Sequence, residues 1–328
     1  MSSRFLFVLL VLTSSTCANA KSIEWPFSSD FNLLVNVTIG TPGQSLPLVL
    51  WADTFNDLLV VDTRIGGNFD PSASSTFVVN GDCPNYDGTG IMGVTGTDKF
   101  QFGNVVVEKL ETFNVVTNSS YQFFGHVGLA HSTNNSKTFI DSLLNDFEKK
   151  VVTFSFDSLG LLTSTGLLSI GSRLADRCAD DWNLVPEYPY FDWTAEQWGV
   201  KIDSLTIGKY SYDSPGQAQM TLGVENDLQV PLSYMDWIRK ALNAKQKDVV
   251  DCEIQTEIVF TIGNRDLRLQ PDDYVNRLEQ KETGRCYVNF QESVGVNNFV
   301  LPSGYLTRYC VLHDYAGLNV GFSTRLPH

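Results

Sequence analysis

The stretch Asn36-Val-Thr-Ile-Gly-Thr-Pro-Gly-Gln44 is followed, after one residue, by Leu46-Pro-Leu-Val-Leu-Trp-Ala-Asp-Thr54. Apolar and polar residues largely alternate on both sides of a Gly-Thr-Pro-Gly segment, which is typical of two strands joined by a turn. Similar short runs of β-branched and aromatic residues recur at 100–107, 167–170 and 257–262. The whole pattern favours an all-β fold with a few short helices.

Two segments, 138–150 and 233–246, instead repeat apolar residues at helical spacing. The residues expected to face the protein interior are Phe139, Leu143, Leu144, Phe147, Met235, Ile238 and Leu242. Ser233 followed by Asp236 predicts an N-terminal cap for the second segment. We expect both helices to lie on the surface, packed against sheets.

Residues 1–20 have the features of a secretory signal, with Arg4, an apolar run over 5–12 and a small-residue cleavage site at Ala18-Asn-Ala20. We therefore expect the mature chain to begin near Lys21. The apolar run is shorter than the ~20 residues that a membrane-spanning helix needs. We expect a soluble, secreted protein without a membrane span, found outside the cell or in a lysosome-like lumen.

The formal net charge of −14 and the scattered basic residues argue against nucleic acid as a partner, because phosphate contacts need clustered Lys and Arg. The histidines show no metal-ligand spacing and no Cys-x-x-Cys motif is present, so we expect neither a metal site nor a cofactor.

Cysteine usage fits an oxidising compartment. Five cysteines remain once Cys17 leaves with the expected signal: Cys83, Cys178, Cys252, Cys286 and Cys310. An odd number leaves one thiol free, buried or paired between chains. Three acceptor sequons for N-glycosylation agree with export: Asn36, Asn118 and Asn134.

The opening stretch resembles the start of pepsin-like aspartic proteases, in which a strand, an Ile-Gly-Thr-Pro turn and a second strand deliver the first catalytic Asp-Thr-Gly. Further segments are similar to this family in the same order: 69–77, 86–90, 125–130, 198–205, 252–275 and 299–322. The resemblance implies a bilobal pepsin-like acid protease fold, with an N-terminal lobe over 21–184 and a C-terminal lobe over 185–328. It also implies a monomer and a disulfide between Cys252 and Cys286.

The resemblance implies a catalytic pair that this chain lacks. Aspartic proteases use two carboxylates that share one proton, one from each lobe. Asp53 is retained, but Phe55 stands where the family has a glycine. In the second lobe, 217–223 is similar to the strand that leads into Asp-Thr-Gly, and it puts Thr221 or Leu222 at the aspartate. Neither side chain can exchange a proton near neutral pH.

Other positions also depart from the family pattern. The nearest acidic residues, Glu225 and Asp227, lie a few residues further on, and Pro302 stands beside the second active-site loop. Only about ten residues separate the expected cleavage site from a first strand expected near Phe31, which is too short for a propeptide that plugs the cleft.

Residues 86–90, Tyr-Asp-Gly-Thr-Gly, resemble the flap tip that closes over substrate in this family. Counting back from Gly88-Thr-Gly90 puts Asp87 at the place of the flap tyrosine, and a one-residue insertion restores Tyr86. The candidate substrate-binding residues are therefore Tyr86, Asp87, Gly88, Thr89 and Gly90.

The favoured interpretation is a secreted, non-proteolytic pepsin homologue whose interlobe cleft binds a peptide, a protein or a glycan. The resemblance includes inactive family members, so it does not by itself imply activity. The alternative is an aspartic endopeptidase with residual activity, in which Asp53 works with Glu225 or Asp227. A pair of Asp53 residues across a symmetric dimer is disfavoured, because the second lobe would occupy that face.

Overall fold

The computed structural model describes residues 22–29, 33–51, 57–82, 92–103, 105–119, 125–131, 138–159, 164–188, 198–221, 228–245, 248–277, 280–293, 298–302 and 306–327. Within these ranges the chain forms three β-sheets, and its helices are short. The all-β class with a few short helices, expected from the sequence, is confirmed.

The largest sheet has thirteen described strands in the order β11-β23-β22-β9-β10-β1-β2-β3-β8-β4-β7-β6-β5. Their bounds are β1 (Ile23–Ser29), β2 (Leu33–Ile39), β3 (Gln44–Trp51), β4 (Leu58–Val61), β5 (Val78–Asp82), β6 (Met92–Phe102), β7 (Val105–Asn118), β8 (His126–Gly128), β9 (Val151–Leu159), β10 (Ser164–Ile170), β11 (Asn183–Pro186), β22 (Tyr309–Asp314) and β23 (Asn319–Thr324).

The second sheet has seven described strands in the order β17-β16-β12-β13-β21-β14-β20. Their bounds are β12 (Gly199–Ile207), β13 (Tyr210–Thr221), β14 (Leu228–Val230), β16 (Ile258–Ile262), β17 (Arg265–Leu269), β20 (Phe290–Glu292) and β21 (Phe299–Pro302). The third sheet contains β15 (Val249–Val250), β19 (Cys286–Val288) and β18 (Val275–Asn276). The helices are α1 (Phe139–Leu144), α2 (Leu232–Ala241), α3 (Pro271–Tyr274) and α4 (Gln280–Thr283), with 3-10 turns η1 (Thr63–Ile65) and η2 (Pro71–Ala73).

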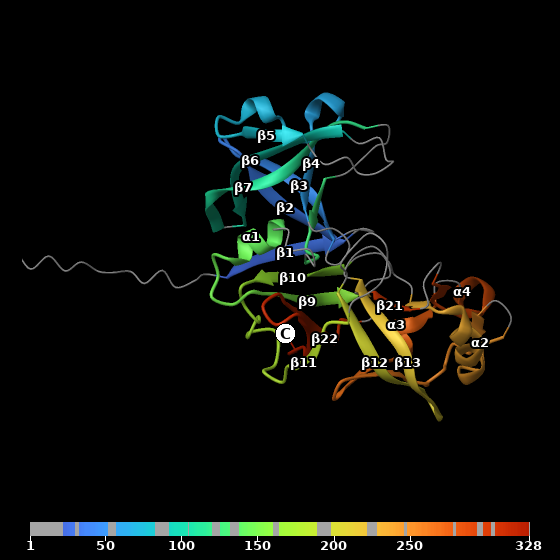
Figure 1. Cartoon of the computed structure of the whole chain (residues 1–328). Coiled ribbons are helices and arrows are strands. Elements are labelled where there is room, and N and C mark those ends of the chain that lie inside the picture. The colour runs from blue at the N-terminus through green and yellow to red at the C-terminus, as the bar shows by residue number, and fades with distance from the viewer. Residues whose placement is uncertain are drawn as a thin grey trace, which may run out of the picture.

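Figure 1 shows two lobes joined by a central layer. Strands β2 to β7 make one lobe, the seven-stranded sheet with α2, α3 and α4 makes the other, and β9, β10, β11 and β22 lie between them. Strand β11 spans the boundary expected between residues 184 and 185 and pairs with β23. No helix in the described ranges is long and apolar enough to cross a bilayer.

The opening stretch forms the hairpin that its alternation predicts. In β2, Leu33, Val35, Val37 and Ile39 are buried while the residues between them are exposed or half-buried. Gly40 then turns the chain with φ at +92°, and a Cβ there would lie 2.8 Å from Ser74 Oγ. Glycine is needed at this turn for both reasons. The first described strand, β1, begins at Ile23, earlier than the first strand expected near Phe31.

Both helices differ from the sequence prediction in their ends. Helix α1 ends at Leu144, because the chain turns there and the Phe147 ring packs under Gly171 instead of continuing the helix. Helix α2 begins one residue earlier than expected, at Leu232. Its N-cap is Pro231, which makes no side-chain capping hydrogen bond, so the expected cap by Ser233 was wrong. Met235, Ile238 and Leu242 are buried as predicted.

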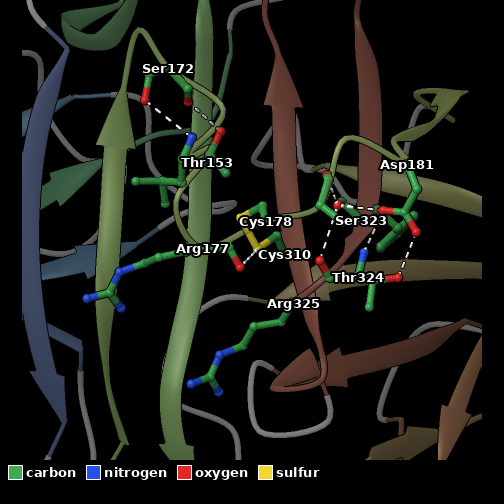
Figure 2. Close-up of a disulfide and its surroundings, with 12 residues drawn as sticks. Thr153, Ser172, Arg177, Cys178, Asp181, Cys310, Ser323, Thr324 and Arg325 are labelled. Atoms are coloured by element: carbon green, nitrogen blue, oxygen red, sulfur yellow. Dashed lines mark hydrogen bonds between the residues drawn. A yellow bond between two sulfur atoms is a disulfide. The ribbon is translucent and has the colours of Figure 1, made fainter. Parts of the chain in front are cut away.

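Two disulfides are present among the described residues. Cys252 and Cys286, the pair implied by the resemblance, are bonded across 34 residues. Cys178 and Cys310, whose pairing the sequence left open, are bonded across 132 residues. Figure 2 shows that this second disulfide joins the segment between β10 and β11 to strand β22 in the central layer. Cys83 lies outside the described residues.

Candidate functional site

The first candidate loop lies within a fixed arrangement of strands. Strand β3 ends at Trp51, and β4 begins at Leu58. Strand β8 lies between them, parallel to β3 and antiparallel to β4, so that Trp51 faces Gly128 and Leu59 faces His126. Strand β4 in turn runs parallel to β7. Residues 52–57, of which only Asp57 is described, join β3 to β4, and we call them the first crossing.

The second half of the chain repeats this arrangement strand for strand. Strand β13 ends at Thr221, β14 begins at Leu228, and β21 lies between them. Strand β21 is parallel to β13 and antiparallel to β14, with Thr221 facing Pro302 and Gln229 facing Val300. Strand β14 runs parallel to β20, as β4 does to β7. Residues 222–227, which lie outside the described ranges, join β13 to β14 and are as many as residues 52–57; we call them the second crossing.

Most of the sequence-predicted site residues lie outside the described ranges. These are Asp53, Phe55, Tyr86, Asp87, Gly88, Thr89, Gly90, Asn134, Leu222, Glu225 and Asp227. Thr221 and Pro302 are described only as the paired last residues of β13 and β21. Asn36 in β2 and Asn118 at the end of β7 are exposed, as acceptors of glycans must be.

Asp57, the last residue before β4, is held by polar side chains from two neighbouring strands. His126 Nε2 lies 2.9 Å from its Oδ1, and Asn114 Nδ2 donates to its Oδ2 at 2.9 Å. The His126 side chain is only 3% exposed and that of Asp57 is 24% exposed. This network fixes the C-terminal end of the first crossing against β7 and β8.

The sequence analysis did not identify Asp57 and His126 as site residues. A signal was available, because Asn56-Asp57-Leu58 is repeated as Asn226-Asp227-Leu228 at the end of the second crossing. The repeat is what a correspondence between Asp57 and Asp227 would produce.

A polar cleft of about 750 Å³ opens elsewhere on the molecule. Its lining residues come from β11, β17, β22, β23 and the segments next to them, and include Asp181, Trp182, Arg265, Arg268 and Arg308. None of the strands that frame the two crossings contributes to it. The two crossings, not this cleft, therefore define the candidate site. No cluster of three or more potential metal-ligating side chains occurs in the described ranges.

Comparison with known proteins places this arrangement in a family. The family model described as eukaryotic aspartyl protease matches residues 33–325. Aspartic protease 6 of Caenorhabditis elegans is 26% identical over 90% of this chain and 82% of its own length. Aspartic protease 17 of the same organism is 23% identical over 95% of this chain and 88% of its own length. Cathepsin D of Bos taurus is 22% identical over 88% and 83%.

The matched region covers nearly all described strands, including both crossings and the strands that frame them. The repeated strand order and the family match agree on a duplicated, two-lobed β architecture. The chain belongs to the eukaryotic aspartyl protease family.

Proposed function

We propose that this protein is a secreted, non-proteolytic member of the family that binds a peptide, a protein or a glycan in the cleft between its lobes. The observation that carries the proposal is the matched register of the strands that flank the two crossings, from which Asp53 aligns with a residue that has no carboxylate.

The alignment follows from positions at both ends of each crossing. Trp51 and Thr221 are the corresponding last residues of β3 and β13. Leu59 faces His126 as Gln229 faces Val300, so the far ends correspond in the same register. Ala52 then corresponds to Leu222, and Asp53 corresponds to Gly223. This register favours Gly223 over Thr221 or Leu222 as the counterpart of Asp53.

All three possible counterparts lead to the same chemistry. A glycine, a threonine or a leucine cannot share a proton with Asp53, so no acid and base coexist at one pH. Phe55 adds a second obstacle, because a side chain replaces the glycine that lets the loop turn beside the carboxylate.

The endopeptidase alternative needs an unconventional second carboxylate. The register aligns Asp227 with Asp57, whose carboxylate is held by His126 and Asn114 at the base of the crossing. It aligns Glu225 with Phe55, two residues past Asp53. Two residues of extended chain span about 6–7 Å, more than general acid–base geometry tolerates. The non-proteolytic interpretation therefore has the better support.

The disulfides and the glycosylation sequons support a compartment for the protein. Two disulfides agree with an oxidising compartment. Exposed sequons at Asn36 and Asn118 agree with passage through the secretory route. We expect an extracellular protein, or one in a lysosome-like lumen, that acts as a monomer.

The register can be tested by restoring the missing groups. Phe55→Gly combined with Gly223→Asp should gain affinity for pepstatin, measured by calorimetry, because only this pair puts two carboxylates at corresponding positions. Phe55→Gly combined with Leu222→Asp is the matched control and should gain none. Equal affinities of the two double variants would contradict the proposed register.

The binding role needs a separate experiment. Immobilised wild-type protein is incubated with a mixture of long peptides, and the bound peptides are eluted and sequenced by mass spectrometry. If the cleft binds peptides without cleaving them, the eluted peptides should be a selected set with their original ends. The result should be the same for the wild type and for Asp53→Asn. Newly cut ends that disappear in Asp53→Asn would support the endopeptidase alternative instead.

A further inference from the structure

A buried aromatic cluster of Trp198, His313, Tyr315 and Phe154 lies next to the end of β8. Leu129 follows β8, and its amide donates to the carbonyl of Trp51, the last described residue before that crossing, at 2.8 Å. The Leu129 carbonyl accepts a hydrogen bond from Trp198 Nε1 at 3.3 Å and one from the Tyr315 hydroxyl. Residues from both halves of the chain thus fix the end of β8.

His313, in strand β22, packs against Trp198 of this cluster. Its ring stacks on Trp198 with 4.4 Å between ring centroids and 21° between planes. The Phe154 ring contacts it at 5.4 Å from strand β9. His313 is completely buried, and within the described part of the chain neither of its ring nitrogens has a hydrogen-bond partner. A buried polar side chain without a partner is rare and costly, and the cost rises steeply if the ring becomes charged.

No described group around His313 is placed to accept a hydrogen bond from its ring if the ring becomes protonated. His131 contacts the edge of Trp198, and its Nε2 is paired with Glu187 Oε1 at 2.6 Å. The Tyr315 hydroxyl is committed to Leu129. Strands β9 and β23 present only the apolar Val152 and Val320 at the positions that pair with His313.

This geometry shifts the pKa values of two groups in the cluster. Burial lowers the pKa of His313 well below its usual range, and the nearby charge of His131 lowers it further. Burial raises the pKa of Tyr315 well above its usual range, with Asp141 of α1 and then Glu187 adding to the rise. Tyr315 therefore stays a neutral donor at any physiological pH.

We propose that His313 is an acid-sensitive brace, which holds Trp198 and Leu129 in place only while it is neutral, so that acid lowers the stability of the folded lobe junction. A protonated His313 needs water or an acceptor, and it can reach either only if the stack on Trp198 opens. Opening that stack moves Trp198, whose Nε1 donates to the Leu129 carbonyl. The Leu129 amide, which donates to the Trp51 carbonyl, is then held less firmly.

The sign of the effect follows from linkage. A histidine that must be neutral in the folded state takes up a proton on unfolding whenever the pH is below its unfolded pKa of about 6.5. The folding free energy is therefore undiminished by His313 above that pH, and it becomes less favourable as the pH falls below it. Relatives that work as acid proteases need a fold that survives acid, so the brace would restrict this protein to a less acidic range than theirs.

Urea unfolding of the wild type and of His313→Phe, followed by tryptophan fluorescence from about pH 7 to pH 5, tests the brace. Phenylalanine keeps a ring against Trp198 and Phe154 but cannot be protonated. The unfolding constant of the wild type should rise about 25-fold more than that of His313→Phe over this range. His126→Gln is a control, because His126 is also buried but pairs with Asp57, outside the cluster. This variant should show the same His313-dependent rise of the unfolding constant as the wild type.

The proposal would be overturned if, between pH 7 and pH 5, the unfolding constant of the wild type rose less than about threefold more than that of His313→Phe. If His313→Phe does not fold, the histidine Cε1–H signals of the wild type decide the matter by NMR. The proposal expects the His313 signal to keep its neutral position in the folded protein down to about pH 5. An ordinary titration with a midpoint near 6.5 in the folded protein would equally overturn it. Neither result depends on whether the protein cleaves peptides.

Discussion

Removal of the Cys178–Cys310 disulfide should be strongly destabilising, and the size of the effect can be worked out from the structure. The bond closes 132 residues, but Cys252–Cys286 already closes 34 of them. The unfolded chain therefore has an effective loop of roughly 100 residues, for which the chain-entropy estimate is about 4.7 kcal/mol. Both sulfurs are buried, beside Leu174, so alanine substitution also leaves small voids.

The assay is equilibrium urea unfolding of a Cys178→Ala/Cys310→Ala variant at neutral pH, followed by tryptophan fluorescence. The matched control is Cys252→Ala/Cys286→Ala, whose shorter loop predicts a loss of about 4 kcal/mol. Hydrogen exchange should show that β11 and β23 lose protection first in the Cys178/Cys310 variant, because that disulfide anchors the segment leading into β11. A loss below about 2 kcal/mol, or one well below the control's, would refute the reasoning.

Three further predictions concern single side chains. Trp25→Ala should cost about 3–5 kcal/mol in urea unfolding, because Trp25 is 2% exposed and packs 4.8 Å from the ring of Phe102; a loss under about 1 kcal/mol would contradict this packing. Burial pushes the pKa of Asp181 up, but hydrogen bonds from its neighbours outweigh this and lower it. Asp181→Asn should therefore cost about 1–2 kcal/mol at pH 7, allowing for the exposure of this carboxylate. That cost should fade as the pH drops below about 4 in thermal unfolding, and an undiminished cost at pH 3 would argue against it. Asn36→Gln and Asn118→Gln should each increase the gel mobility of protein secreted from eukaryotic cells by one glycan, and unchanged mobility would show that the site is unused.

The parts of the fold that depend on local alternation could be predicted from the sequence. Buried and exposed residues alternate along β2 as the sequence suggests, because one face of that strand meets the core. Helix ends were less predictable. The apolar spacing over 138–150 continues to Phe147, yet this ring packs under Gly171, a contact between distant residues that no local pattern reveals. The same holds for Cys178 and Cys310, which 132 residues separate.

The strand before the first crossing could be recognised from the sequence, but the counterpart of Asp53 could not be aligned from it. The strand leading to Asp53 is recognisable, whereas its counterpart carries no acidic residue from which to count. Strand pairing supplies the missing reference, because β8 and β21 pair in the same register with the strands on both sides of their crossings. The Asn-Asp-Leu repeat at the crossing ends agrees with that register. The His313 cluster depends on tertiary burial, and a lone histidine in a sequence does not reveal it.

The central claim is that the chain keeps the family fold but lacks the paired carboxylates of its chemistry. The most direct measurement is hydrolysis of a denatured protein by the purified mature chain from about pH 3 to pH 7, with and without pepstatin and beside Asp53→Ala. The account predicts no pepstatin-sensitive hydrolysis at any pH and no difference between the wild type and Asp53→Ala. Robust hydrolysis by the wild type that pepstatin blocks and Asp53→Ala abolishes would contradict it.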